Sequence, residues 1–323
     1  MLQTAQNMQE KDIISVVLCS YNSVARLKPT IEALACQQLK EGVGWEFVFV
    51  DNASTDGSAE YVSQLWTEAK EPAPLRIIHE PQPGLIYARY AGVKHAKGSI
   101  VIFCDDDNWL QKDYLQRCYD LLTSHPNYGA VGGQGIAVSD VPLPEEWEKW
   151  QNDYACGKIA NSSCVVDDIR GLFGAGLAVR AEVLERVFSQ PFVSVGRSGT
   201  NMASGDDTEI CDRILLLGYS LFYDEDLVFR HYMPENRLSR EYHDKLLKGF
   251  EKVYPMQKKY RLCIKFRKLT GKQLFHEFFV RIGMVCKLRN MNSLAELRDF
   301  LVFGCGWLCL ADEESKKIYR LKL

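Results

Sequence analysis

Paired cysteine motifs and long apolar runs are both missing from this chain. Its eleven cysteines are an odd number, lie scattered along 323 residues and form no Cys-x-x-Cys pair, which predicts reduced thiols rather than a disulfide framework. Residues 1–11 are polar and lack the apolar segment of a signal peptide. The longest apolar run, at residues 300–311, is shorter than a membrane span and contains Gly304 and Gly306. We therefore expect a cytoplasmic protein without a membrane-spanning helix.

Two glycine-rich nucleotide-binding motifs are also missing. No Gly-x-Gly-x-x-Gly follows the first apolar segment, which excludes the dinucleotide-binding fingerprint of a Rossmann fold. No Gly-x-x-x-x-Gly-Lys-Ser/Thr occurs either, which excludes a P-loop protein.

Charge is divided unevenly along the chain. The net charge of −3 argues against a nucleic-acid-binding surface over the whole molecule, so no nucleic-acid partner is expected. Residues 240–323 contain 19 Lys and Arg against 9 Asp and Glu, whereas the remainder contains 20 basic and 33 acidic residues. An acidic body with a basic C-terminal segment predicts that this segment meets an anionic partner.

Apolar runs of strand length alternate with segments of helical periodicity in the first half of the chain. The runs lie at residues 13–19, 45–50, 75–79 and 100–104. This alternation predicts an α/β fold with a mostly parallel central sheet flanked by helices. Ligands of such sheets bind outside the carboxyl ends of the strands, so polar residues that end a run are candidate site residues.

Three consecutive aspartates, Asp105, Asp106 and Asp107, end the fourth of these runs. Because alternate strand residues share a face, Asp105 and Asp107 are expected to point the same way and Asp106 away from them. Two convergent carboxylates suit Mg²⁺ or Mn²⁺. His231 ends a later strand-like run and is a further candidate metal ligand. Taken alone, the three acids fit a solvated turn equally well.

Other polar residues are expected at the same edge of the sheet. Asp51 ends the second run, where it can reach a nucleotide base or ribose. Arg89 lies just inside a helix that starts at this edge and can pair with a diphosphate. Asp206 and Asp207 open a later helix, where carboxylates complement the helix dipole or serve as a general base. Capping and ordinary surface roles stay open as alternatives.

These segments together resemble the inverting family 2 glycosyltransferases of the GT-A fold, from about residue 13 to about residue 239. The resemblance rests on motifs in the family's order: the opening strand at residues 15–22, the Val-Asp-Asn-Ala-Ser-Thr-Asp-Gly-Ser turn at 50–58, the Gly-x-x-x-Ala-Arg-x-x-Gly helix at 84–92, the DXD motif at 105–107 and Gly-Asp-Asp-Thr-Glu at 205–209. Two positions depart from it. Asp206 stands where the family usually has Glu, and Asn108 where a fourth acid is frequent.

The resemblance implies metal-dependent transfer of a sugar from a nucleotide-diphosphate donor to a glycan or lipid-linked acceptor, in bacterial surface polysaccharide synthesis. It implies that the metal, Mg²⁺ or Mn²⁺, is held by Asp105 and by Asp107 more directly, and that Asp207 is the catalytic base. His231 stays a candidate ligand because of its position at the end of a strand-like run. The residues expected to bind the donor nucleotide are Ser20, Tyr21, Asn22, Asp51, Arg89, Asp105 and Asp106.

Two functions other than sugar transfer are compatible with the same fold. A nucleotidyltransferase also uses paired acids and a metal, but it usually needs a glycine-rich basic loop after the first strand, which residues 20–23 do not form. A non-catalytic carbohydrate- or nucleotide-sugar-binding protein is disfavoured by the intact acids Asp105, Asp107 and Asp207.

A loop at residues 141–163 departs from the α/β alternation. It holds Trp147 and Trp150 in a polar segment that follows Pro142 and Pro144. Aromatic rings on loops either anchor the loop or stack on ligands such as sugars. We expect one tryptophan to do each, and the loop to influence the choice of acceptor.

The chain is expected to divide into a catalytic domain at residues 1–239 and a basic, mainly helical C-terminal region at residues 240–323. Basic and apolar residues interleave at residues 252–311. Two interpretations of this segment stay open. It forms a peripheral contact with the inner face of the cell membrane, or it packs on the catalytic domain with a solvated basic face.

Overall fold

The computed structural model describes residues 13–166, 171–194, 196, 205–288 and 291–321. Its strands are β1 (Ile13–Ser20), β2 (Gly44–Asp51), β3 (Leu75–His79), β4 (Ile100–Asp105), β5 (Asn108–Leu110), β6 (Tyr128–Val138), β7 (Cys164–Val166), β8 (Ala178–Arg180) and β9 (Ser220–Tyr232). Its α-helices are α1 (Val24–Ala35), α2 (Ser58–Glu68), α3 (Leu85–His95), α4 (Tyr114–Ser124), α5 (Trp147–Trp150), α6 (Ala181–Val187), α7 (Asp206–Leu216), α8 (Arg240–Arg267), α9 (Gly271–Leu288), α10 (Met291–Phe303) and α11 (Glu313–Arg320). Three short 3₁₀ turns are η2 (Gln151–Tyr154), η3 (Glu235–Arg237) and η4 (Leu308–Leu310).

The strands form one mixed sheet in the order β3-β2-β1-β4-β8-β6-β9-β5, and β7 pairs with β9. β1 runs parallel to β2 and β4, β2 runs parallel to β3, and β6 runs parallel to β9. The short strands β5, β7 and β8 run antiparallel to their neighbours. Most paired residues therefore lie in parallel ladders, and the predicted α/β class with a mostly parallel sheet is confirmed.

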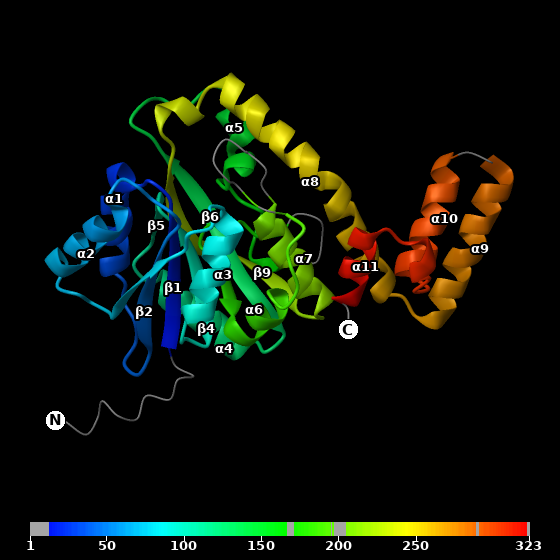
Figure 1. Ribbon diagram of the computed structural model, residues 1–323, viewed down its shortest axis with the longest axis horizontal. Coiled ribbons are helices and arrows are strands. Elements are labelled where there is room, and N and C mark those ends of the chain that lie inside the picture. The colour runs from blue at the N-terminus through cyan, green and yellow to red at the C-terminus, as the bar shows by residue number, and fades with distance from the viewer. Residues whose placement is uncertain (1–12, 167–170, 195, 197–204, 289–290, 322–323) are drawn as a thin grey trace.

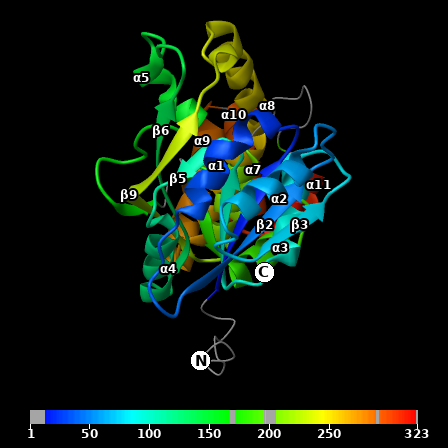
Figure 2. The ribbon, with the colours of Figure 1, turned by 90° about the vertical axis from the view of Figure 1, so that its left-hand side faces the viewer.

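Burial on both faces explains why the central strands have continuous apolar sequences. In β1, Ile14, Val16 and Leu18 belong to the core on one face of the sheet and Val17 to the core on the other, because successive strand residues point to opposite faces. Figure 2 shows α1 and α2 beside each other on the first face, which α4 also covers. Helices α3, α6 and α7 cover the second face (Figure 1).

The long helix α8 runs along the part of the molecule that contains the sheet, as Figure 1 shows. Its side chains Val253, Met256 and Tyr260 join the same core as helix α7. The domain boundary expected after residue 239 falls just before this helix. The division of the chain into two domains stays a prediction. Because α8 packs on α7, the first half of α8 lies where it can contribute side chains to the edge of the sheet at which a site is expected.

Helices α9 and α10 pack against each other at the end of the molecule away from the sheet (Figure 1), and α10 and α11 contact α8. The C-terminal region is therefore mainly helical, as the sequence predicts. Within the described part of the chain, no helix combines the length and the hydropathy needed to cross a membrane.

Candidate active site

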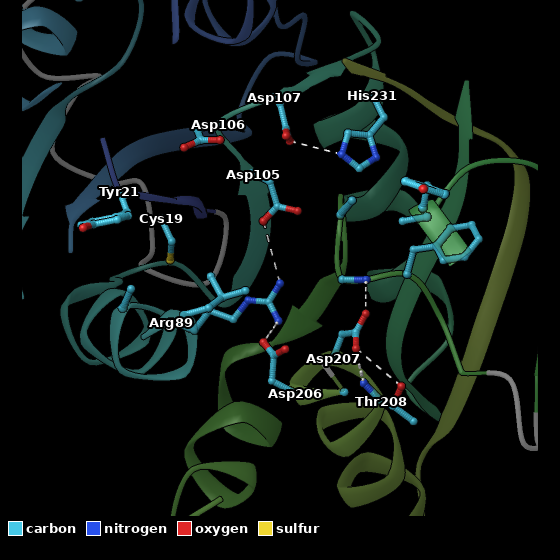
Figure 3. Close-up of a pocket in the computed structure, with 18 of the residues that line it drawn as sticks. Cys19, Tyr21, Arg89, Asp105, Asp106, Asp107, Asp206, Asp207, Thr208 and His231 are labelled. Carbon is cyan, nitrogen blue, oxygen red and sulfur yellow. Dashed lines mark hydrogen bonds and ion pairs between the residues drawn. The ribbon is translucent and has the colours of Figure 1, made fainter. Parts of the chain in front are cut away.

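A cavity of about 750 Å³ opens where β1 and β4 end. Side chains from the ends of these strands, from the start of α3 and from the start of α7 line it. Helix α8 and the α5–η2 segment also contribute to its wall. The predicted edge of the sheet is therefore hollowed, and Figure 3 shows the acidic side chains that gather there.

Asp106 lies on the α1 side of the cavity, away from Asp107. Its carboxylate accepts two hydrogen bonds from the Arg26 guanidinium, at 2.7 and 2.8 Å, and its carbonyl oxygen accepts one from Thr30 Oγ1 at 3.0 Å. A two-point Arg–carboxylate contact is geometrically specific. Asp106 therefore holds α1 to the end of β4, and its predicted contact with the donor remains to be tested.

Asp107 points to the opposite side and meets two cationic groups. Its Oδ1 lies 3.3 Å from His231 Nε2, and its Oδ2 accepts a hydrogen bond from Arg237 Nη1 at 2.9 Å. Burial opposes ionisation of this carboxyl group, but the charges of His231 and Arg237 outweigh it and hold the pKa of Asp107 well below its usual value. Burial likewise opposes the charged imidazole, yet Asp107 raises the pKa of His231 to about 10.

The distance between Asp107 and His231 can be compared with the spacing of ligands around a divalent ion. Adjacent ligands of an octahedral ion with bonds of about 2.1 Å lie roughly 3 Å apart, close to the 3.3 Å between Asp107 Oδ1 and His231 Nε2. A carboxylate oxygen with an imidazole nitrogen suits a transition ion such as Mn²⁺ better than Mg²⁺. These two residues fit a metal once His231 has lost its proton, because only a neutral imidazole binds a metal ion. Among the described residues, no group of three His, Cys, Asp or Glu side chains converges on one such position, so Asp105 as a ligand stays a prediction.

Arg89 lies between the DXD motif and helix α7 (Figure 3). Its guanidinium donates to Asp206 Oδ2 at 2.6 Å and lies 3.9 Å from Asp105 Oδ1. Arg89 and Asp206 are both buried, with 3% and 4% of their surface exposed, so each requires the other as a counter-charge. The shorter Asp206 side chain, in place of the family's usual Glu, is thus supported by Arg89 from helix α3.

Asp207 lines the cavity at the first turn of α7, facing the DXD motif across it. Its Oδ1 accepts a hydrogen bond from the backbone N–H of Thr208 at 2.7 Å, and its Oδ2 one from the N–H of Gly174 at 3.3 Å. Burial and the charge of Asp206 raise the pKa of Asp207, against the opposing charge of Arg89. A carboxylate with a raised pKa is better suited to accept a proton.

The remaining predicted nucleotide contacts divide into two groups. Ser20 and Tyr21 line the cavity, and half of the Tyr21 surface is exposed. Asn22 and Asp51 hold the turn after β2 instead: Asn22 Oδ1 accepts from Thr55 N at 2.9 Å, and Asp51 Oδ1 accepts from Ser54 N at 3.1 Å. Neither is among the described residues that line the cavity, so their donor contacts remain predictions.

Both tryptophans of the 141–163 loop serve as anchors. Trp147 is buried and packs on Tyr154, with ring centroids 5.2 Å apart, and Trp150 stacks on His243 of α8 at 4.4 Å. Neither is among the described residues that line the cavity. Tyr154 of η2 and His243 of α8 are the aromatic partners of these two rings, and the expectation that one tryptophan contacts a ligand stays a prediction.

Several cavity residues were missed by the sequence reasoning because they lie outside the recognised motifs. They are Tyr154, Arg237, Tyr242, Phe250 and Gln257. Arg237 follows His231 by six residues, but its local sequence is that of an ordinary surface arginine. The α8 residues gave no signal either, since their side of the helix is defined only by packing on α7.

The family of this chain follows from comparison with known proteins. The family described as Glycosyl transferase family 2 matches residues 15–188, more than half of the chain. The chain therefore belongs to glycosyl transferase family 2, and the predicted membership is confirmed.

Curated glycosyltransferases are similar to the chain at low identity. Glycosyltransferase GlyA of Streptococcus pneumoniae serotype 4 is 22% identical over 241 residues, which are 72% of this chain and 32% of GlyA. Glycosyltransferase AglE of Haloferax volcanii is 24% identical over 220 residues, covering 68% of this chain and 66% of AglE. The putative teichuronic acid biosynthesis glycosyltransferase TuaG of Bacillus subtilis is 29% identical over 131 residues, covering 40% of this chain and 50% of TuaG. The chain thus spans only about a third of GlyA.

Solved structures of low sequence identity share the fold. The mannosyltransferase PcManGT from Pyrobaculum calidifontis, in complex with GDP-Man and Mn²⁺, superposes with a TM-score of 0.52 at 19% identity, covering 96% of this chain and 83% of PcManGT. S. aureus TarS superposes with a TM-score of 0.51 at 15% identity, covering 94% of this chain and 50% of TarS. The predicted GT-A fold is confirmed by these neighbours.

Proposed function

We propose that this chain is a metal-dependent inverting glycosyltransferase that moves a sugar from a nucleotide-diphosphate donor to a glycan or lipid-linked acceptor. The observation that carries the proposal is one cavity with Asp107 and His231 at one side and Asp207 at the other. Solved neighbours were captured with GDP-Man and Mn²⁺ or with UDP-GlcNAc. The similarity to TuaG supports a place in bacterial surface polysaccharide synthesis.

Asp207 is assigned the role of general base. The acceptor hydroxyl is a poor nucleophile until a base takes its proton as it attacks the anomeric carbon. Gly174 and Thr208 direct backbone N–H groups at the Asp207 carboxylate, and this orients the side chain. Attack from the face opposite the leaving diphosphate inverts the anomeric configuration.

The opposite side of the cavity is assigned to the donor diphosphate. Asp107 and His231 would hold a divalent ion, with Asp105 as a further predicted ligand, and the ion would supply positive charge that stabilises the leaving diphosphate. Ser20, Tyr21 and Arg89 line the same cavity. We assign Ser20 and Tyr21 to donor binding, with Arg89 holding Asp206 and Asp105 in place.

The substitution Asp207→Asn tests this function directly. It keeps the shape of the side chain and removes the base, so kcat for sugar transfer should fall roughly 10²–10⁴-fold. Wild-type activity should also decline as pH falls through the raised pKa of Asp207, because the protonated acid cannot accept a proton. The measurement is turnover of UDP-GlcNAc and GDP-Man with Mn²⁺, followed as release of UDP or GDP.

Asp113→Asn is a matched control, since Asp113 is exposed and is not among the described residues that line the cavity. It should retain wild-type turnover. Full activity in Asp207→Asn would overturn the assignment of the base. Metal-dependent donor binding without any turnover would favour a non-catalytic nucleotide-sugar-binding protein, and release of pyrophosphate from a nucleoside triphosphate would favour a nucleotidyltransferase.

The basic C-terminal region belongs to the same proposal as a peripheral membrane contact of a cytoplasmic enzyme. Helix α9 exposes Phe275, with 67% of its surface accessible, and Phe279, with 54%. These two rings are one turn apart and therefore lie on one side of the helix. Lys272 and Lys287 are exposed on the same helix. Exposed aromatic rings beside basic residues suit an anionic membrane surface, where a lipid-linked acceptor would be held.

A further inference from the structure

Arg237 lies at the site although no sequence motif pointed to it. It ends the short turn η3, just after β9, and its side chain lines the cavity. Its carbonyl oxygen accepts a hydrogen bond from the Tyr154 hydroxyl at 3.0 Å, and the next residue, Leu238, is buried in a core with Trp147. The backbone of Arg237 is thus held in place, while its long side chain reaches Asp107.

Each aspartate of the DXD motif lies near an arginine, but the three arginines are not equivalent. Arg26 holds Asp106 through two hydrogen bonds, and Arg89 is buried against Asp206. Arg237 makes one hydrogen bond to Asp107, and 24% of its side chain is exposed at the cavity. A guanidinium has five N–H donors. Arg237 therefore has the capacity to bind a second anion within the cavity.

The partner of Arg237 is the carboxylate that the proposed metal site requires. A guanidinium and a divalent cation compete for the same carboxylate charge, so Arg237 opposes cation binding while it stays on Asp107. A guanidinium also matches the geometry of phosphate oxygens. The donor assigned to this cavity carries two phosphates.

We propose that Arg237 exchanges partners during donor binding. In the donor-free protein its guanidinium neutralises Asp107. When a nucleoside diphosphate enters, the guanidinium turns to the phosphate oxygens and leaves the Asp107 carboxylate available to a divalent cation. This inference rests on the proposed function for the chemistry of the donor, and it adds a coupling between diphosphate binding and cation binding at one arginine.

A simpler role for Arg237 makes the opposite prediction. If Arg237 only orients Asp107 as a metal ligand, its removal should weaken cation binding, since loss of such outer-shell partners typically costs 10–100-fold in metal affinity. If Arg237 competes with the cation, its removal should strengthen cation binding in the absence of nucleotide.

The first measurement is Mn²⁺ binding to the whole chain without nucleotide, followed by electron paramagnetic resonance of free Mn²⁺. Arg237→Ala should bind Mn²⁺ several-fold more tightly than wild type. Arg237→Lys keeps a positive charge near Asp107 and should stay close to wild type. Arg240 is an exposed arginine three residues after Arg237. Arg240→Ala removes the same charge and should also leave Mn²⁺ affinity unchanged. Unchanged or weaker Mn²⁺ binding in Arg237→Ala overturns the exchange.

The second measurement separates phosphate recognition from general damage to the site. In calorimetric titrations with Mn²⁺, Arg237→Ala should lower the affinity for UDP or GDP roughly 10- to 100-fold, the loss expected for a hydrogen bond to a charged group. UMP or GMP binding should change little, because the second phosphate is missing. Equal losses for the diphosphate and the monophosphate would overturn the assignment.

An error in the proposed donor class gives a different result from an error in the role of Arg237. If wild type binds neither UDP nor GDP, nor any other nucleoside diphosphate of a complete panel, the donor class is wrong, and the exchange is overturned with it. If wild type binds a diphosphate but Arg237→Ala binds it equally well, the donor class stands and only the role of Arg237 is overturned.

Discussion

Three acidic residues of the site, Asp106, Asp107 and Asp206, are each paired with a cation that is distant in the sequence. Asp106 and Arg26 are 80 residues apart, Asp206 and Arg89 are 117 apart, and Asp107 and Arg237 are 130 apart. Buried carboxylates need such counter-charges. The acids could be predicted because they end strands or open a helix. Their partners could not, since nothing in the local sequence of Arg26 or Arg237 distinguishes them from surface arginines.

Gly174 provides a prediction at the residue scale. A Cβ at this position would lie 2.9 Å from Asp207 Cβ and 2.8 Å from Arg89 Nη2, both closer than ordinary contacts. Gly174→Ala should displace the Asp207 carboxylate, and a shift of about 1 Å in a catalytic group can cost on the order of 10²-fold in rate. The measurement is kcat for donor turnover, with a thermal melt to show that the variant folds.

Gly283→Ala is the control for the Gly174 prediction. Its added Cβ has no atom within 4 Å among the described residues, so kcat should be unchanged. Wild-type kcat in Gly174→Ala would show that the backbone of residues 172–175 can shift and that the close approach is not required.

Helices α7 and α8 are joined by buried polar side chains. Tyr260 of α8 donates a hydrogen bond to Glu209 of α7 at 2.8 Å, and Glu209 also accepts one from Arg213 at 2.8 Å. All three are almost fully buried. Since α7 carries Asp207, this network fixes the helix that holds the proposed base.

Asp212 on α7 gives a prediction for this element. It is buried, its Oδ2 has no hydrogen-bond partner among the described residues, and burial raises its pKa to about 8 against the opposing charge of Arg261. Between about pH 4 and pH 8 the folded chain therefore keeps a proton that the unfolded chain has released. As pH rises across this window, Asp212 alone should lower the free energy of unfolding by about 1.4 kcal/mol per pH unit.

Asp212→Asn should remove that dependence, because the amide stays neutral. Urea unfolding of both proteins at pH 5, 7 and 9 measures the effect, and the variant should gain stability relative to wild type as pH rises. Asp244→Asn, an exposed substitution on α8, is the control. A stability difference between Asp212→Asn and wild type that does not change with pH would show that Asp212 is ionised in the folded chain.

The elements themselves were predictable to different degrees. The first four βα segments have strong periodicity, and β1 to β4 appear close to where the sequence places them. The three-residue strands β5 and β7 were not expected, because they exist only through pairing with β9. The strand β9 starts at Ser220, well before the short strand-like run that ends at His231 in the sequence, since polar Asp224 and Asp226 interrupt its apolar pattern.

At the scale of the whole molecule, α9 and α10 lie at the end away from the sheet (Figure 1). Helices α9 and α10 pack on each other, and their exposed apolar side chains include Phe275, Phe279 and Leu294. An apolar surface with neighbouring basic residues should bind anionic vesicles, with about 1 kcal/mol for each basic residue near the surface. The whole chain should therefore sediment with phosphatidylglycerol vesicles and much less with phosphatidylcholine vesicles.

The double substitution Phe275→Asp with Phe279→Asp should abolish this sedimentation while donor turnover in solution is unchanged. Leu143→Asp, which alters an exposed apolar residue in the loop after β6, should sediment as wild type does. Failure of the wild-type chain to bind anionic vesicles would remove the membrane contact and leave the proposed sugar transfer intact.

The sequence alone determined the fold class, the edge of the sheet at which the cavity lies, and the presence of Asp105, Asp107 and Asp207 around that cavity. These are local properties, because periodicity and the position of a residue at a strand or helix end are readable from neighbouring residues. Only the tertiary structure decided the partners of those acids and the wall contributed by α8. The tertiary structure also divided the predicted nucleotide residues into two groups. Ser20 and Tyr21 line the cavity, whereas Asn22 and Asp51 hold a turn. The physical reason is that a buried charge is stabilised by whichever group the folded chain brings within a few ångströms, and that distance is set by packing rather than by sequence separation.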